Sequence, residues 1–101
     1  MNIHMVKMHT VHETYIRSLH VTEKGALLAF CSHVAEYLLG YVGYEDAFQK
    51  EEVALLNEIM EYTKQDKTAT DTLKSYKNTM EDWFGQKVEM WSEIIVGTLL
   101  P

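Results

Sequence analysis

The sequence predicts an all-α fold, a small antiparallel helical bundle of three long helices plus a short N-terminal helix. Three observations favour this fold class. One proline and five glycines leave few obligatory turns, which favours a few long helices over many short strands. Apolar residues recur at three- and four-residue spacings along most of the chain, as they do on one face of an α-helix. The polar segments between these stretches are short, and short connections favour antiparallel neighbours.

Length and composition indicate one globular domain that spans residues 1–101. Hydrophobic residues make up 47% of the chain and charged residues 24%, so the chain can bury a core. Residues 1–9 are expected to form a flexible or extended arm. Ile3, Met5, Val6 and Met8 alternate imperfectly there, so a short strand, a loop and an early helical turn all remain open.

Several classes of protein are excluded by the same composition. No apolar run approaches the roughly 20 residues of a membrane span, and no secretory signal is visible at the N-terminus. Cys31 is the only cysteine, which excludes an internal disulfide and fits a cytoplasmic location. The net charge of −6 argues against direct binding to nucleic acid.

The first half of the chain predicts two helices. Thr10 and Glu13 match a capping box, which indicates the start of the short helix. A second helix is expected from Glu23 to about Val42, with Thr22 as its N-cap. Its apolar face covers more than half of its circumference, so this helix is expected to be central, with neighbours on two sides. Because the link between the two is weakly marked, one kinked helix remains an alternative.

An acidic helix is expected from Tyr44 to about Thr63, followed by a polar loop over residues 64–69. Residues 45–66 carry seven acidic and two basic side chains, which is nearly all of the excess negative charge. The surface is either a solvated helix face or a patch that steers a basic partner. Its acidic residues are Glu45, Asp46, Glu51, Glu58 and Glu61.

The last helix is expected to begin at Thr70 or Asp71 and to end at Gly97. If continuous, it would have about 27 residues and be about 40 Å long. A compact chain of this size is only about 33 Å across, so the apolar end would overhang and need a partner. Gly85 is the weak point, since a glycine inside a helix costs about 1 kcal/mol relative to alanine, and a break there would remove the overhang. The predicted partner-binding or dimer interface is this end: Lys87, Met90, Trp91, Ile94, Ile95 and Leu99.

Two charged residues project into apolar helix faces. Glu52 does so in the acidic helix and Lys87 in the last helix. An unpaired buried charge is unfavourable, so each is expected to have a partner, a path to solvent or a ligand. Lys87 either extends along Trp83 into water, pairs with Glu52, or marks a site for an anionic ligand or a partner carboxylate.

Five apolar residues are expected to lie in the hydrophobic core: Phe30, Val34, Leu38, Leu56 and Met80.

All five histidines lie in the first third of the chain. His9, His12 and Glu13 form a weak candidate metal site on one helix face. The order His-x-x-Glu reverses the di-iron motif, so surface or capping histidines are the expected interpretation and no metal is assigned.

Two further pairs contain a histidine. His33 and Glu36 lie on the polar side of their helix at three-residue spacing. His12 and Cys31 could meet and activate the thiol, but nothing is placed to orient them. Cys31 is therefore expected to be a buried, unreactive thiol.

The expected function is that of a small acidic protein–protein interaction module. No glycine-rich phosphate loop, pair of catalytic carboxylates or serine nucleophile turn is present, so neither enzymatic activity nor a cofactor is expected. The module would act as an inhibitor, regulator or adaptor that docks on another macromolecule, as a homodimer with a partner that is basic. The alternative is a small-ligand- or metal-binding bundle, which uses the histidine-rich N-terminal third or a pocket around Lys87 and the tyrosines.

Overall fold

The computed structural model describes residues 2–10, 13–40, 48–84 and 90–98. Over these residues the fold is α+β, and the expectation of an all-α bundle is wrong. The strands are β1 (Asn2–Thr10), β2 (Thr14–His20) and β3 (Met90–Thr98). The helices are α1 (Glu23–Leu39), α3 (Lys50–Thr63) and α4 (Thr70–Phe84).

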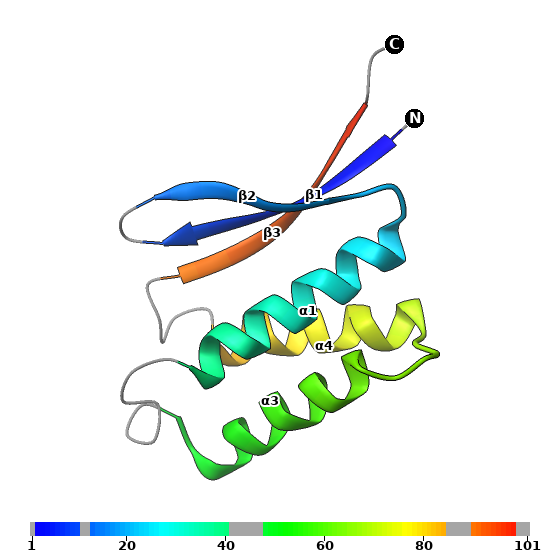
Figure 1. Ribbon diagram of the computed structural model, residues 1–101. Helices are drawn as coiled ribbons and strands as arrows, with labels where there is room; N and C mark the ends of the chain where they lie inside the picture. The colour runs from blue at the N-terminus through cyan, green and yellow to red at the C-terminus, as the bar shows by residue number, and fades with distance from the viewer. Residues whose placement is uncertain (1, 11–12, 41–47, 85–89, 99–101) are drawn as a thin grey trace.

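The three strands form an antiparallel sheet with β1 at its centre. β2 pairs with one edge of β1 and β3 with the other. The first and last strands are paired along their whole length, from Asn2 opposite Thr98 to Thr10 opposite Met90. The start of β1 and the end of β3 therefore lie side by side (Figure 1).

Helix α1 lies between the sheet and the other two helices (Figure 1). It contacts all three strands on one side and both α3 and α4 on the other. The Thr22 hydroxyl accepts the Gly25 N–H at 3.0 Å as the N-cap, and Gly40 is the C-cap. The prediction of a central helix with neighbours on two sides is confirmed, although one of those neighbours is a sheet.

The hydrophobic core fills both sides of α1. Val6 and Met8 enter it from β1, and the rings of Phe48 and Phe84 meet edge to face with centroids 5.0 Å apart. The five positions predicted for the core are all buried, so that prediction is confirmed: Phe30, Val34, Leu38, Leu56 and Met80.

The prediction of a short N-terminal helix that begins at Thr10 is wrong. Thr10 ends β1, and residues 14–20 form β2. Val6 lies opposite Ser18 and Lys7 opposite Ile16, which leaves Arg17 as the extra residue of a β-bulge. The bulge interrupts the alternation that marks a strand in the sequence, and the apolar positions around it then resemble a helical spacing.

The prediction that the last helix has an overhanging apolar end is also wrong. α4 ends at Phe84, immediately before the predicted weak point Gly85, and residues 90–98 form β3. This segment contains Ile94, Ile95 and Val96, whose branched side chains favour strands. Hydrogen bonds to β1 also satisfy the backbone N–H and C=O groups of β3, so this segment does not need to be helical.

The N-terminal residues are not an arm, because 2–10 form the central strand, one of the three conformations left open by the sequence.

The acidic helix begins at Lys50, and residues 44–47 of its expected range lie outside the described residues. Within the described part of the chain, no helix combines the length and the apolar character that a membrane span requires.

Candidate functional site

One face of the sheet has no helix against it among the described residues. Side chains of directly paired residues point to the same side of a sheet, and they alternate along each strand. Met5 and its partners Leu19 and Ile95 therefore point away from α1, since Val6 on the other side is buried in the core. We call this side the open face: Ile3, Met5, Lys7, His9, Thr14, Ile16, Leu19, Glu93, Ile95 and Gly97.

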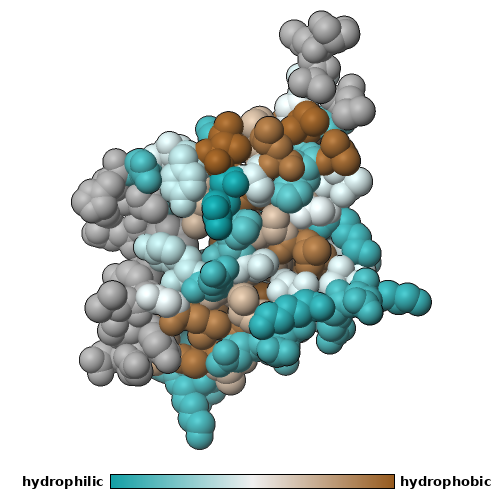
Figure 2. Space-filling view, in the orientation of Figure 1, coloured by the Kyte–Doolittle hydropathy of each residue, from teal (hydrophilic) through white to brown (hydrophobic). Residues whose placement is uncertain are grey.

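The open face is apolar over much of its area. Leu19 is 61% exposed and Ile16 is 51% exposed. A Cβ added to Gly97 would lie 3.4 Å from the Met5 Cε atom, so the Met5 side chain extends across to β3. Figure 2 shows hydrophobic side chains gathered at the top of the molecule, where the sheet lies in Figure 1. Contiguous exposed apolar surface of this kind marks interaction sites.

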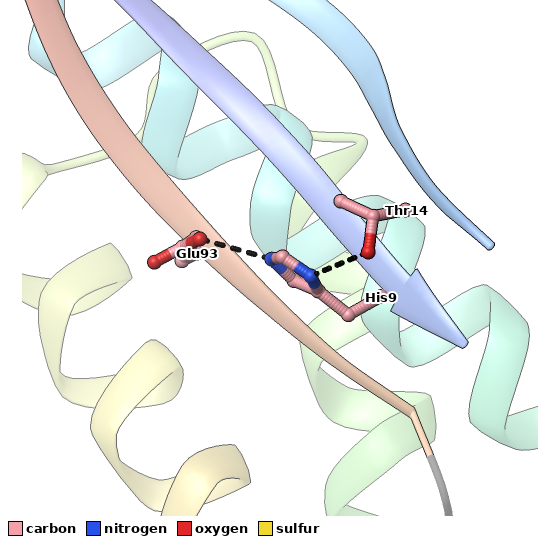
Figure 3. A network of polar contacts seen from close by, with 3 residues as sticks. All are labelled: His9, Thr14 and Glu93. Atoms are coloured by element: carbon pink, nitrogen blue, oxygen red, sulfur yellow. Dashed lines mark hydrogen bonds and ion pairs between the residues drawn. The ribbon is translucent and has the colours of Figure 1, made fainter. Parts of the chain in front are cut away.

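A polar cluster joins all three strands at one end of the open face (Figure 3). The His9 Nε2 atom lies 2.9 Å from a carboxylate oxygen of Glu93, and Nδ1 lies 3.0 Å from the Thr14 hydroxyl. A carboxylate only accepts hydrogen bonds, so Nε2 carries a proton. In the neutral imidazole Nδ1 then accepts from Thr14, and both ring nitrogens are satisfied.

Charge is divided unequally between the sheet and the helices. The three strands carry Lys7 and Arg17 against Glu93. The three helices carry nine acidic and four basic side chains, a net charge of −5. On the open face itself Lys7 balances Glu93, so this face is close to neutral while the helical layer is acidic.

The structure separates the residues predicted as an interface. Ile95 lies on the open face, whereas Ile94 pairs with Val6 and packs against the core. Met90 and Trp91 belong to β3, but their side chains lie outside the described residues, as do Lys87 and Leu99.

The rest of the open face was not predicted from the sequence. Ile16 and Leu19 follow Thr10 and Glu13, where the sequence predicts a short helix, and Met5 lies in the predicted N-terminal arm. The imperfect alternation from Ile3 to Met8 was the signal that could have identified the strand that carries Met5.

The predicted acidic surface lies partly on α3. Glu51, Glu58 and Glu61 are exposed there, while Glu45 and Asp46 lie outside the described residues. The Tyr76 hydroxyl donates to Glu58 over 3.1 Å, which links α4 to α3.

The buried charge predicted at Glu52 has a partner in the backbone. Its side chain is 7% exposed and accepts the N–H of Gln49 at 2.8 Å, as half of a capping box at the start of α3. The carboxylate therefore lies at the positive end of the helix dipole. The proposed pairing with Lys87 concerns a residue outside the described range.

The histidine and cysteine candidates are placed differently from the expectation. His9 lies in a strand, so it cannot share a helix face with His12, which is outside the described residues. Glu13 is exposed just before β2. In the described parts of the chain, no group of three or more metal-ligating side chains is arranged around one point.

Cys31 is fully buried, as predicted, and its thiol points to the carbonyl of Leu73 at 3.5 Å. Burial raises the pKa of the thiol to about 12, and the Lys77 ammonium offsets only part of that increase. The thiol is therefore neutral at physiological pH and unsuited to act as a nucleophile.

A second candidate site is a cleft of about 620 Å³ on the other side of the sheet, between β2 and α1. It reaches Gly40 at the end of α1. Its walls combine aromatic rings with charged and polar groups: Met8, Tyr15, Arg17, His33, Glu36 and Tyr37.

The polar groups of the cleft influence one another. Burial lowers the pKa of His33, Arg17 and His20 lower it further, and Glu36 opposes them. His33 is thus a neutral imidazole at neutral pH, with one donor and one acceptor nitrogen. Their spacing in the sequence pairs His33 with Glu36 but does not place Arg17 beside them, because that placement requires the bulge in β2.

Comparison of the chain with protein families, with characterised proteins and with solved structures found no match. Function is therefore inferred from the geometry and chemistry of the open face, the acidic helical layer and the cleft.

Proposed function

We propose that the chain is a protein-interaction module that pairs with a second copy through the open face and docks on a basic protein partner through its acidic helical layer. The observation that carries this proposal is an apolar, charge-balanced sheet face directly opposite a layer of acidic helices. Such a module acts by binding rather than by catalysis.

The apolar side chains supply the driving force for pairing. Fully burying a leucine or isoleucine that was exposed contributes about 1.5–3 kcal/mol. Burial of Leu19 and Ile16 should contribute most to the free energy of pairing, because both side chains are more than half exposed on the edge strand β2. In a twofold dimer each copy uses the same face. Both open faces are then buried in a single contact, and none stays exposed to bind a third copy.

The charges make a second copy the best-suited occupant. Two acidic proteins repel each other, and the repulsion falls as their charges move apart. When two open faces meet, the acidic helices point outward on both sides of the dimer. Lys7 and Glu93 of each copy supply opposite charges at the contact, which gives a rim suited to a twofold arrangement.

The outward helices then provide the surface for another protein. Glu51, Glu58 and Glu61 remain exposed on α3, and in a dimer they occur twice. Two separated acidic surfaces favour a partner with basic patches, since electrostatic complementarity raises the association rate.

A matched pair of substitutions tests the pairing surface. Leu19→Glu adds a charge to the open face, and Val96→Glu adds one to the opposite side of β3, where Val96 is 56% exposed. Light scattering on a sizing column should show that Leu19→Glu shifts the protein to the monomer mass, whereas Val96→Glu leaves the wild-type mass. If Leu19→Glu keeps the wild-type mass, the open face is not the contact between copies.

A further inference from the structure

The β-bulge in β2 gives Arg17 an unusual position. Arg17 is the extra residue between Ile16 and Ser18, and it lines the same cleft as Tyr15, so the bulge turns it toward α1. In a regular strand, alternation would send neighbouring side chains to opposite faces. No hydrogen bond or ion pair joins the Arg17 guanidinium to another of the described residues. A planar group with five donors is thus presented to the cleft with its donors available.

The walls of the cleft suit a flat apolar body. Tyr15 and Tyr37 are 39% and 38% exposed, and Met8 beneath them is buried. Aromatic rings pack well against other rings, in stacked or edge-to-face arrangements. The volume of about 620 Å³ is within the range of roughly 300–1,000 Å³ typical of small-molecule sites.

The remaining polar groups limit the charge of the ligand. Glu36 lies on the same cleft as Arg17, and its carboxylate disfavours a doubly charged anion such as phosphate. A single negative charge avoids most of that repulsion. His33, neutral at physiological pH, offers a further donor without adding a positive charge.

We propose that this cleft is a binding site for a small aromatic carboxylate. Arg17 pairs with the carboxylate through parallel N–H donors, and His33 donates a further hydrogen bond to it. The aromatic ring of the ligand lies between Tyr15 and Tyr37, over Met8. The site lies on the opposite side of the sheet from the open face, so ligand binding there does not depend on self-association.

Two matched probes test the ligand class. 2-Naphthoate carries the aromatic body and the carboxylate, and 2-naphthamide has nearly the same shape without the charge. Two-dimensional NMR titrations should show saturable shifts for naphthoate at residues around Tyr15, Arg17, His33 and Tyr37, with binding at least about tenfold weaker for naphthamide. Inorganic phosphate should bind more weakly than naphthoate.

Two variants test the role of Arg17. Arg17→Gln should weaken naphthoate binding about tenfold or more, while Lys50→Gln, which removes a positive charge from the exposed start of α3, should leave it unchanged. Bound naphthoate should also raise the midpoint of the His33 titration, because an added negative charge favours the imidazolium against Arg17 and His20 and adds to the effect of Glu36. Circular dichroism of both variants confirms that the fold is retained.

Three results would overturn the proposal. The first is the absence of saturable shifts around the cleft with naphthoate. The second is equal binding of naphthoate and naphthamide, or tighter binding of phosphate. The third is unchanged naphthoate affinity in folded Arg17→Gln protein.

Discussion

The imidazole of His9 and the carboxylate of Glu93, 84 positions apart in the chain, lie 2.9 Å from each other across strands β1 and β3. The contact is partly sheltered, with the His9 side chain 16% exposed and Glu93 37% exposed. It lies beside the backbone ladder that joins the first strand to the last. The pair therefore adds a side-chain link to the contact that closes the sheet.

The His9–Glu93 pair should contribute modestly to stability. In a double-mutant cycle of His9→Ala and Glu93→Ala, urea unfolding should give a coupling free energy of about 0.5–1 kcal/mol, the usual value for a partly exposed charged hydrogen bond. The exposed pair Lys64–Glu61, at 3.7 Å, should show almost none and serves as the reference. A zero coupling for His9 and Glu93 would mean that the contact does not hold β3 on β1.

Glu52 should matter through its backbone contact at the start of α3. Glu52→Ala removes the acceptor for the Gln49 N–H and should lower the free energy of unfolding by about 1 kcal/mol or more, because the donor loses its partner. Glu51→Ala is the control, since Glu51 is exposed on the same turn. Equal unfolding midpoints in urea for the two variants would show that the capping box is not needed.

Cys31 should make stability depend on pH in the alkaline range. Its thiol pKa is raised from an ordinary 9.0 to about 12, so well below pH 9 the thiol is neutral in both the folded and the unfolded chain. Between these values the unfolded chain loses a proton that the folded chain keeps, and the free energy of unfolding falls as pH rises.

Cys31→Ala lacks this group, so its stability should decline less steeply than that of the wild type across the same pH range, even if a small cavity lowers it throughout. Parallel declines in urea unfolding would contradict a shielded thiol. Native wild-type protein should also react slowly with iodoacetamide at pH 8, and rapid labelling would contradict burial of the thiol.

The helical part of the fold was predictable because its signals are local. Thr22 marks the N-cap of α1, and the wide apolar face of that helix correctly implies two neighbours. Glu52 was identified as a charge that needs a partner, and the backbone at Gln49 supplies one. Gly85 marked the weak point of the last helix, which ends one residue before it.

The sheet was not predictable because its signals depend on pairing between distant segments. β3 is stable as a strand only against β1, about ninety residues earlier in the chain, and neither segment shows a regular alternation by itself. The bulge at Arg17 displaces the pattern of β2 by one residue. The open face and the cleft both depend on these strands, so the apolar surface was expected on the end of a helix instead.

The most direct test of self-association through the open face is the solution mass of the wild-type protein, measured by light scattering on a sizing column over a concentration series. Pairing through the open face predicts a mass of twice 11.7 kDa that decreases toward 11.7 kDa only on dilution. A mass of 11.7 kDa at every concentration would contradict pairing with a second copy and leave the apolar sheet face for a different protein.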